Sequence, residues 1–483
     1  MPVVVATGQV VERTEPVDAL ELAVRAVDLA LAGAPALRRG VQQVSMVSSL
    51  SATGPAPATA LAQRCGMTPR RVEVSTIGGN TPQWFVTRAA QAIADGELDS
   101  VLVVGAEAQR SARLAPATGA GHDAPAPPAT PDAVVGDERP GAGPAELAAR
   151  LITPVQVYAL FESVLAHRAG RTPAEQRAAL AELMAPFTEV AARHPCAWFP
   201  TARRPEELAE VGPDNRIVAE PYPKRMCAVL GVDQGAAVLV TSLAAARAAG
   251  VDDDVVFCWS GADASDVWFP SARPDLGTSP GIAAAAGAAL GAAGLGVDDV
   301  EAFDLYSCFP CAVELGAAAL GLAWDDPRGL TVTGGLPYFG GPGNNYSLHA
   351  IATVADRLRH RGGTAYVGAL GWYVTKHAAG VYGAGPPPGG WRRGDTAEIQ
   401  RRIDSTALEV TDTAEGPAVV AAGTVVHGRD GSVVAAPVVA DLPDGRRVVA
   451  AAHDDELGAL AGRDLVGAPV TVWGAPPRYR LAG

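Results

Sequence analysis

Short apolar runs alternate with alanine-rich stretches along the chain up to about residue 396. The runs carry β-branched residues without polar alternation, which is typical of strands buried on both faces of a sheet. Six strands are predicted, at Val44–Val47, Val101–Val104, Ala237–Val240, Val255–Trp259, Ala302–Leu305 and Ala365–Ala369. Because helical stretches separate them, the pattern indicates a layered α/β fold with a largely buried sheet.

After Thr396 the apolar residues recur with a period of two, and GRDG and PDGR turns separate the segments. The alternating segments are Ala418–Val426, Ser432–Val439 and Arg446–Ala452. We therefore predict a small separate β domain over residues 397–483, with a five-stranded barrel as its expected form. The pattern does not distinguish one kind of small barrel from another.

One arrangement occurs twice: a glycine-rich loop that ends near an asparagine enters an apolar helix, and the helix leads to a strand. The first loop is Ile77–Thr81, before a helix predicted over Gln83–Ile93. The second is Gly340–Asn345, before a helix predicted over Ser347–Leu358. Two half-domains of one topology would bring two helix N-termini to a shared centre, where free N–H groups favour an anion or a developing oxyanion. Two ordinary glycine-rich turns are the alternative.

The composition narrows the classes of function. Hydrophobic residues make up 48% of the 483 residues and charged residues 19%, as in a folded globular protein. The 38 Lys and Arg against 52 Asp and Glu argue against nucleic-acid binding, which requires a clustered basic surface. Of six cysteines, only Cys308 and Cys311 lie close together, without a second pair at zinc-ligand spacing. We expect no metal, reduced thiols and a cytoplasmic location.

The chain has no obvious membrane segment. No basic region precedes the apolar run at its N-terminus, so a signal peptide is not expected. The longest uncharged apolar stretch, Gly281–Val297, is rich in Ala and Gly and is shorter than the roughly 20 residues of a membrane span. We predict a buried helix there.

Five segments resemble a known family: VEVSTIGGNTPQ at Val72–Gln83, AAQAIADGELDSVLVVGAEA at Ala89–Ala108, DLYSCFP at Asp304–Pro310, GGLPYFGGPGNN at Gly334–Asn345 and GWYVTKHAAGVY at Gly371–Tyr382. The chain resembles the thiolase superfamily from residue 2 to about 383, and more closely the thiolase-like proteins with an additional C-terminal domain. The resemblance implies two stacked βαβαβαββ halves in a five-layered α/β/α/β/α core. It also implies a homodimer and an acyl-coenzyme A (acyl-CoA) ligand.

The resemblance suggests three units. The N-terminal thiolase half spans residues 1–245 and includes a lid insertion over 114–224. The C-terminal half spans 246–396, and the additional β domain spans 397–483. The start of the insertion, residues 114–144, is rich in Pro, Gly and Ala and fits neither a helix nor a strand, which predicts a long loop.

The residues that the family uses for acyl transfer are replaced. The resemblance implies a nucleophilic Cys at the start of the first buried helix, a second Cys as base, and an Asn and a His that hold the thioester oxygen or a water. Here the nucleophile position is Gly79, or Thr76 in a shifted alignment; the His position is Gly341 and the second Cys position is Gly371. The Asn-Glu-Ala-Phe or His-Asp-Cys-Phe motif reads Tyr306–Phe309, YSCF.

Four side chains remain candidates for proton transfer. Cys308 follows a predicted strand and can act as base or nucleophile, or can be a buried apolar thiol. Tyr306 can donate to an oxyanion or transfer a proton in a retro-aldol reaction, or can be a core tyrosine. His349 lies one turn into the second buried helix, where it can be a base or a packed histidine. His377, beside Lys376, lies in the late loop that should hold the missing base.

Five further residues are candidates for binding. Asn80, Asn344 and Asn345 can donate amide hydrogens to an oxyanion, although asparagine also caps helices for structural reasons. Lys224 and Arg225, at the end of the lid, can bind the phosphates of CoA or be a solvated pair.

These observations favour a thiolase-like acyltransferase that acts on or binds an acyl-CoA or an acyl-carrier thioester, with no permanently bound cofactor. Its base would be Cys308 or His377, with the three asparagines as oxyanion donors. One alternative is a retro-aldol lyase on a CoA ester that uses Tyr306. Another is a non-catalytic acyl-CoA-binding scaffold whose catalytic positions have become glycine, as at Gly79, Gly341 and Gly371.

Overall fold

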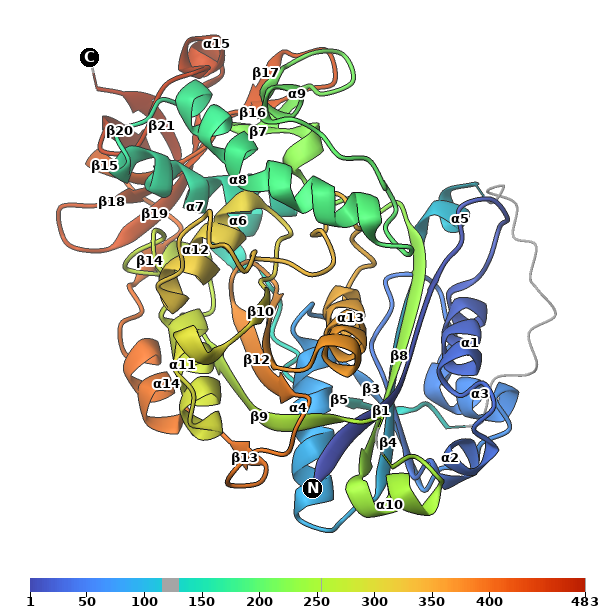
Figure 1. Ribbon diagram of the computed structural model, residues 1–483. Helices are drawn as coiled ribbons and strands as arrows, with labels where there is room; N and C mark the ends of the chain where they lie inside the picture. Colours follow the sequence, from blue (N-terminus) through green and yellow to red (C-terminus); the bar gives the residue numbers. More distant parts are fainter. Residues whose placement is uncertain (115–129, 253, 483) are drawn as a thin grey trace.

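The computed structural model describes residues 1–114, 130–252 and 254–482 (Figure 1). One 11-stranded sheet runs through both halves of the core in the order β10-β11-β12-β9-β1-β8-β4-β2-β3-β5, with β13 added beside β9. The strands of the first half are β1 (Pro2–Val11), β2 (Gln43–Met46), β3 (Arg71–Ser75), β4 (Ser100–Ala108), β5 (Ala133–Val135) and β8 (Asp233–Ser242). Those of the second are β9 (Val256–Ser265), β10 (Ala302–Asp304), β11 (Thr364–Gly371), β12 (Lys376–Gly383) and β13 (Arg392–Arg393).

All six predicted strands are confirmed, as β2, β4, β8, β9, β10 and β11. The two halves meet where β1 pairs with β9 in antiparallel register, Val3 opposite Phe257. The second half departs from a regular βαβαβαββ order between its second and third helices. There the chain lies beside the end of β10, with Leu305 N–H donating to Leu330 O over 2.9 Å, but within the described residues it forms no strand.

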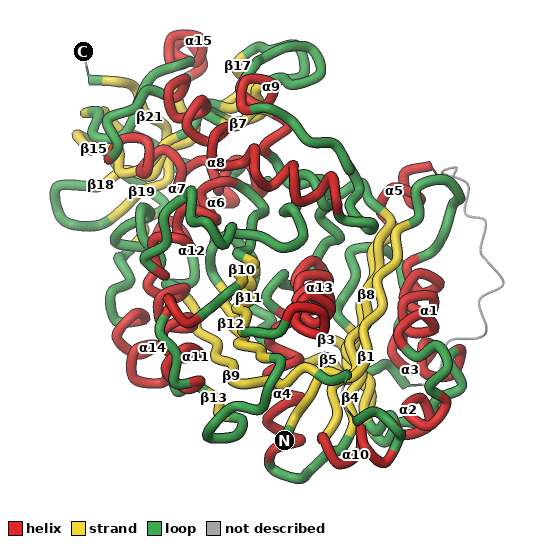
Figure 2. The backbone as a smooth tube through the Cα atoms, viewed as in Figure 1, coloured by secondary structure: helices red, strands yellow, loops and turns green. Residues whose placement is uncertain are grey.

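Two buried helices form the central layer (Figure 2). They are α4 (Thr81–Ala94) and α13 (Tyr346–Arg361), which confirm the predicted pair, and their apolar side chains form a single core with both parts of the sheet. The outer helices are α1 (Ala19–Ala30), α2 (Pro35–Gly40), α3 (Pro57–Arg64) and α10 (Leu243–Ala248) on the first half, and α11 (Pro280–Ala293) and α12 (Pro310–Leu320) on the second. The result is the expected five-layered α/β/α/β/α core.

Helix α11 lies within the apolar stretch that predicted a buried helix. Only one of its faces is buried, with Ala285 and Ala289 packed against the core and Gly287 and Gly291 exposed. Among the described residues, no helix combines the length and the apolar character that a membrane span requires.

The predicted lid is a helical layer. Helix α5 (Gln109–Leu114) leads into it, and its helices and short strands are α6 (Pro144–Ala148), α7 (Pro154–Arg168), α8 (Pro173–Arg193), α9 (Pro205–Ala209), β6 (Ile217–Ala219) and β7 (Tyr222–Pro223). Part of the loop predicted over 114–144 lies outside the described residues. Its described part is not all loop, because β5 pairs in parallel with β3 from Glu73 to Ser75. The prediction missed β5 because prolines and glycines surround its three residues.

The C-terminal domain is a closed five-stranded barrel, as predicted. Its strands are β15 (Gly416–Gly423), β18 (Pro437–Asp441), β19 (Arg447–Ala452), β20 (Pro469–Trp473) and β21 (Arg478–Leu481), and it closes because β19 pairs with both β18 and β21. The other elements of this region are α14 (Ala397–Asp404), β14 (Val410–Thr411), β16 (Val426–His427), β17 (Val433–Ala435) and α15 (Leu457–Leu460). Strand β16 pairs with β6, so the barrel and the lid share a small sheet.

Candidate functional site

A cleft of about 1170 Å³ opens beside the N-terminus of α4. Its walls come from both halves: the loop before α4, the loop after β5, the end of β9, the start of β12 and the segment that leads into α14. Two features define the start of α4. Pro82 lies in its first turn, where the backbone N–H groups have no acceptor within the helix, so the missing N–H of proline costs no hydrogen bond. The Thr81 hydroxyl donates to Gly78 O over 2.8 Å. The cleft therefore lies at the first of the two predicted helix N-termini, and no residue of the second loop, Gly340–Asn345, lines it.

Tyr306 fills the space beside Gly79, one of the two positions predicted for the nucleophile. A Cβ atom built on Gly79 would lie 2.1 Å from the Tyr306 hydroxyl oxygen and 2.6 Å from Leu370 O. Both distances are far below van der Waals contact. Residue 79 therefore has room for no side chain unless Tyr306 and the neighbouring backbone move.

Asn80 fills the second thiol position in the same way. A Cβ atom on Gly371 would lie 2.3 Å from Asn80 Oδ1 and 3.1 Å from Gly78 Cα. At Gly341, the expected His position, a Cβ atom would lie 3.1 Å from Val229 O. Each of the three glycines is thus packed closely by its surroundings.

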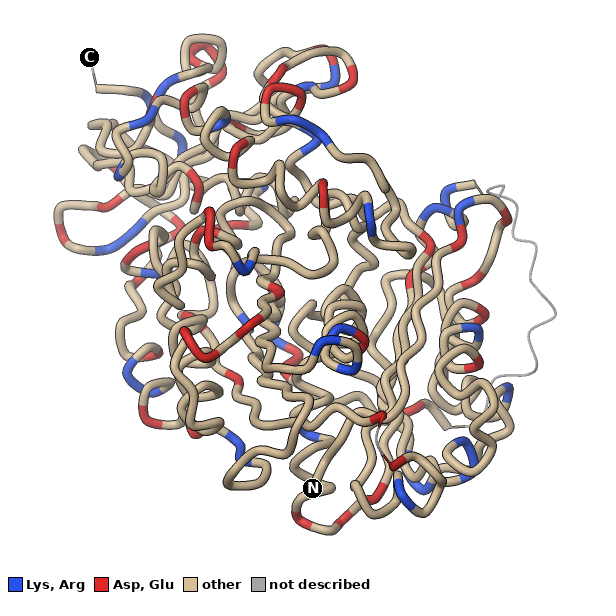
Figure 3. Tube along the Cα trace, viewed as in Figure 1, with Lys and Arg blue, Asp and Glu red and all other residues tan. Residues whose placement is uncertain are grey.

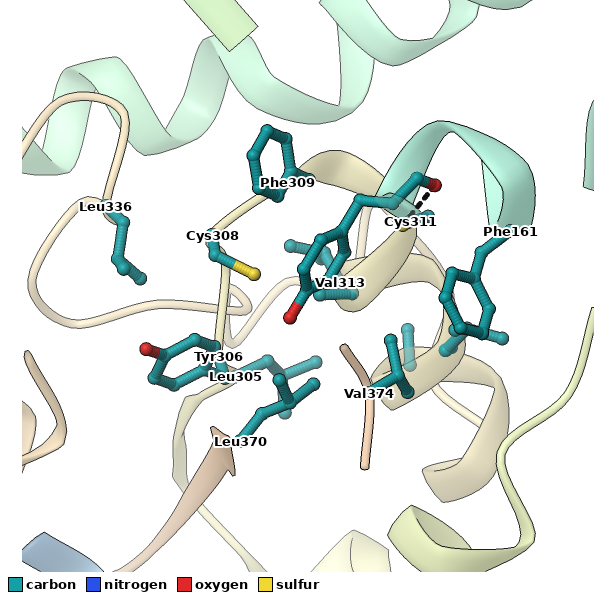
Figure 4. Packing of buried hydrophobic residues seen from close by; sticks show 14 of the residues in the cluster. Phe161, Leu305, Tyr306, Cys308, Phe309, Cys311, Val313, Leu336, Leu370 and Val374 are labelled. Atoms are coloured by element: carbon teal, nitrogen blue, oxygen red, sulfur yellow. Dashed lines mark hydrogen bonds between the residues drawn. The ribbon is translucent and has the colours of Figure 1, made fainter. Parts of the chain in front are cut away.

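Cys308 does not face the cleft. Its side chain lies in the apolar core between Tyr306, Phe309 and Leu336, as Figure 4 shows, and it does not line the cleft. Burial raises the pKa of its thiol to about 12, so the thiolate that a nucleophile or a base requires is scarce at neutral pH. Burial also raises the pKa of Tyr306 well above its usual value, which keeps this phenol protonated.

His377 lies in the wall of the cleft, paired with an acid. Its Nε2 is 2.9 Å from Asp266 Oδ2, and both side chains are buried. The Ser279 hydroxyl donates to the same Asp266 oxygen, and Gly281 N–H donates to Oδ1 over 3.0 Å. Burial tends to raise the pKa of Asp266, but the hydrogen bond from His377 and the nearby Arg273 guanidinium bring it below its usual value. Asp266 is therefore a carboxylate that holds the imidazole in place.

Lys376, next along β12, also lines the cleft. Its ammonium group donates to Ile77 O, and burial lowers its pKa to about 8. Arg139 stands nearby, with its guanidinium carbon 3.6 Å from the centre of the Trp268 ring. Arg139 also donates to Asp137 over 2.6 Å, a bond that lowers the pKa of this carboxyl.

A strained turn presents Lys376 and His377 to the cleft. Between β11 and β12, Trp372 and Val374 adopt φ angles of 56° and 54°, which non-glycine residues rarely do. Packing holds the turn in place, because Tyr158 donates to Trp372 O over 2.7 Å and the indole ring lies against Gly141.

Asn80 lines the cleft, but the other two asparagines do not. Asn344 accepts from Gly78 N–H over 2.9 Å and donates to Ser48 O over 2.8 Å, so its amide ties the two glycine-rich regions together. Asn345 donates to Gly105 O over 2.7 Å. The structure therefore gives both residues positioning roles between the halves.

The remaining candidates lie elsewhere. His349 is buried in α13, where its Nδ1 is 2.9 Å from Gln9 Oε1 and burial lowers its pKa to about 3. Lys224 and Arg225 form a 3₁₀ turn in the lid, where the Arg225 guanidinium donates to Glu207 O over 2.9 Å. None of these three residues lines the cleft, and an isolated cation pair in the sequence did not reveal where the fold would place it.

Asp266 and Ser279 were not predicted from the sequence, and Lys376 was noted only as the neighbour of His377. The first two lie about a hundred residues from His377 along the chain, and only the fold brings the three together. For Lys376, its position in the late loop beside His377 was the only feature of the sequence that indicated a place in the site.

The cleft carries more acid than base. Its lining includes three basic residues, Arg139, Lys376 and Arg393, against six acidic ones, Asp137, Glu138, Asp263, Asp266, Asp395 and Asp404. Figure 3 shows that acidic and basic residues are interspersed along the rest of the chain. In the part of the chain that the structure describes, no group of three or more His, Cys, Asp and Glu side chains is placed to hold a metal ion.

This architecture is a thiolase-like fold with a C-terminal barrel. The model of the thiolase-like protein type 1 additional C-terminal domain matches residues 398–475. The crystal structure of a monomeric SCP2-thiolase-like protein type 1 from Mycobacterium smegmatis has a TM-score of 0.86 and 34% identity, over 100% of this chain and 99% of that chain. The chain belongs to the family of thiolase-like proteins of type 1.

Two more distant structures share the fold alone. An Ltp2-ChsH2(DUF35) aldolase has a TM-score of 0.58 and 20% identity, over 79% of this chain and 97% of that chain. An acetyl-CoA acetyltransferase from Syntrophomonas wolfei has a TM-score of 0.56 and 16% identity, over 79% of this chain and 98% of that chain. A comparison with curated protein sequences gave no match.

Proposed function

We propose that this protein binds an acyl thioester, an acyl-CoA or an acyl-carrier thioester, in the cleft beside α4 and does not form an acyl-cysteine. The observation that carries the proposal is the packing at Gly79, where the Tyr306 hydroxyl occupies the space that a side chain of residue 79 would need. Gly371, filled by Asn80, supports it in the same way. The thiolase-like fold supports the thioester as ligand class, while the loss of both thiols argues against transfer through a covalent intermediate.

The charge of the cleft favours one orientation of such a ligand. Six carboxylates against three basic side chains oppose the entry of phosphate groups. The acyl end would therefore enter, and the nucleotide of a CoA ester would stay outside. On this proposal Lys224 and Arg225 are not the phosphate site, since neither lines the cleft.

Calorimetric titration of the full chain with propionyl-CoA, followed by intact mass measurement, tests the proposal. We expect saturable binding and an unchanged protein mass. The variant Asn80→Leu, in the cleft wall, should weaken binding, whereas Lys224→Ala, outside the cleft, should not. Failure to bind any acyl-CoA would overturn the proposal, and so would a stable acyl adduct on a cysteine.

A second candidate is the cleavage of a carbon–carbon bond in the bound ester, as in a retro-aldol lyase. One observation favours it: Tyr306, whose phenol is kept protonated by burial, lines a small apolar cavity that shares His377 with the cleft, although Tyr306 does not line the cleft itself. His377 would accept the proton of a hydroxyl group and Tyr306 would donate one to the departing enolate. Loss of turnover in Tyr306→Phe with unchanged binding would support this function; turnover equal to that of the parent protein would exclude this role of Tyr306.

A further inference from the structure

Lysine is rare in this chain, and one of its lysines lies in the cleft. Only two of the 38 basic residues are lysines, Lys224 and Lys376. Lys224 is exposed in the lid, whereas Lys376 is only 6% exposed and lines the cleft. Burial of an ammonium group is unfavourable unless the group binds something there. The position of Lys376 therefore suggests a role in the cleft.

The backbone and the side chain of Lys376 are both held in place. Lys376 is the first residue of β12 and pairs with Gly371 of β11 and with Ser265 of β9. The end of its side chain packs against Gly78, where a Cβ atom would lie 2.9 Å from Lys376 Nζ. The ammonium group donates one hydrogen bond, to Ile77 O. An ammonium has three N–H groups, so two of them have no acceptor among the described residues.

Asn80 provides a further donor on the same side of Gly78. Its amide oxygen Oδ1 is buried, 2.5 Å from a Cβ atom built on Gly78 and 2.3 Å from one built on Gly371. The oxygen thus faces the two glycines and not the cleft. Since the side chain of Asn80 lines the cleft, its NH₂ group is the part of the amide that a ligand can reach.

The charges of the cleft indicate which kind of acceptor these donors bind. The carboxylate of Asp137 and the guanidinium of Arg139 act on Lys376 with opposite signs, and they are bonded to each other. Over the whole lining, the excess of carboxylates opposes an anionic group. A neutral carbonyl oxygen can accept two hydrogen bonds without bringing a charge into the cleft. The thioester proposed as ligand carries such an oxygen.

We propose that Lys376 and Asn80 form an oxyanion site, in which their N–H groups donate to the carbonyl oxygen of the bound thioester. The inference rests on the proposed function and adds a lysine that contacts the reacting carbonyl group. Such donors stabilise the negative charge that the oxygen gains when the ester is attacked or when an enolate forms. Burial lowers the pKa of Lys376 only to about 8, so the group is largely charged at pH 7.

Two CoA derivatives of nearly equal shape test this: propionyl-CoA and S-propyl-CoA, a thioether in which a methylene group replaces the carbonyl. Calorimetric titration of the full chain at pH 7 gives a dissociation constant for each. We expect propionyl-CoA to bind about tenfold more tightly, because the thioether leaves the donors unpaired. Infrared difference spectra of bound propionyl-CoA with a carbon-13-labelled carbonyl should show the carbonyl band at lower frequency than in water.

Two variants assign the effect to the donors. Lys376→Met and Asn80→Leu remove the N–H groups at nearly constant shape. We expect the affinity ratio of ester to thioether to fall toward one in Lys376→Met and to decrease in Asn80→Leu. In both variants the carbonyl band should move back toward its frequency in water. Lys224→Met is the matched control, because it removes the other lysine, which does not line the cleft. Its ratio should equal that of the parent protein.

The two lysines also allow a test on the parent protein itself. Protein made with carbon-13-labelled lysine has two lysine side-chain signals in a nuclear magnetic resonance spectrum, and Lys224→Met assigns them. Saturation with propionyl-CoA should shift the signal of Lys376 and leave that of Lys224 in place. An unchanged Lys376 signal at saturation would overturn the oxyanion site.

The outcomes separate the two proposals. Equal affinity for the ester and the thioether overturns the oxyanion site and leaves binding in the cleft intact. An ester preference that persists in both cleft variants also overturns this inference. Absence of binding to propionyl-CoA overturns the proposed function and this inference together. Circular dichroism of each variant shows whether it is folded, and the lysine signals of the parent protein carry the test if Lys376→Met is not.

Discussion

Gly79 and Tyr306 share a space that cannot hold two side chains. Replacing Gly79 by Ala places a Cβ atom against the Tyr306 hydroxyl and Leu370 O. We expect this variant to lose about 1–3 kcal/mol of unfolding free energy because the core is overpacked. Urea unfolding measures the change.

Two further variants make this prediction specific. Tyr306→Ala in the Gly79→Ala background should recover part of the loss, since it removes one of the two contacts. Gly287→Ala, in the exposed face of α11 with open space around it, should be neutral or slightly stabilising. Equal stability of Gly79→Ala and the parent protein would contradict the packing described here.

Residue-level chemistry was only partly predictable from the sequence. The resemblance indicated that glycine stands at the catalytic positions, but nothing along the chain indicated that Tyr306 and Asn80 fill the vacated space. That Asp266 holds His377 depends on the pairing of β12 with β9, which aligns His377 with Ala264. Which strands pair, and in which register, depends on the assembly of the whole sheet and cannot be predicted from the local sequence pattern.

At the level of elements, α7, α8 and α12 meet around a pair of buried acids. Glu162 accepts from Gln176 over 2.6 Å and from Tyr222 over 2.7 Å, while Glu314 Oε2 has no partner in the described residues. Burial raises the pKa of both carboxyls, and the negative charge of Glu162 raises that of Glu314 further. The three helices therefore pack best when the pair holds a proton.

Glu314→Gln should stabilise the fold as the pH rises. A carboxyl whose folded pKa is raised contributes stability that is fully present below its unfolded value, near 4.5, and is lost as the pH rises through the folded pKa. The variant has no proton to lose, so we expect a gain of about 1–3 kcal/mol over the parent protein at pH 8 and a smaller difference at pH 5. Urea unfolding at both pH values measures it.

Glu182→Gln, on the exposed side of α8, is the control and should show no such dependence. If Glu314→Gln were equally destabilised at both pH values, the acid pair would not be the site of the effect.

The elements themselves were more predictable than their contacts. Helices α4 and α13 follow from glycine-rich loops and apolar faces that any chain of this pattern would bury. Strand β5 did not, because its three residues derive their conformation from β3 and not from their own sequence.

At the scale of the whole molecule, the barrel is fastened to the lid by two histidine–acid pairs. Nε2 of His427, in the C-terminal domain, lies 2.9 Å from Oε1 of Glu220 in the lid. Nδ1 of His167, in the lid, lies 2.6 Å from Oδ2 of Asp464 in the C-terminal domain. The hydrogen bond that His427 donates to Glu220 raises the pKa of His427. This pair contributes stability that is fully present below the unfolded value of 6.5 and is lost as the pH rises through the folded pKa.

His427→Gln should therefore flatten the pH dependence of thermal unfolding. We expect the parent protein to lose more of its melting temperature than the variant between pH 6 and pH 8.5. His360→Gln, at the exposed end of α13, should behave like the parent protein. An identical slope in the parent protein and His427→Gln would show that the lid does not depend on this pair.

The subunit state depends on the edge of the core sheet. An open edge strand can pair with a second chain, and β5, which pairs with β3, is the terminal strand at this edge. The relative from Mycobacterium smegmatis is described as monomeric. The expected homodimer stays a prediction, and sedimentation velocity should then give a species near twice the chain mass of 49.2 kDa. A single species near the chain mass would exclude the dimer.

Two of the eight tryptophans, Trp84 and Trp268, line the cleft. Indole emission changes with the polarity around the ring, so the intrinsic fluorescence of these two tryptophans indicates whether a ligand occupies the cleft. A thioester that enters should alter the fluorescence of the parent protein, and Trp84→Phe together with Trp268→Phe should abolish most of that change. The same signal in a stopped-flow instrument would give the rates at which the cleft fills and empties.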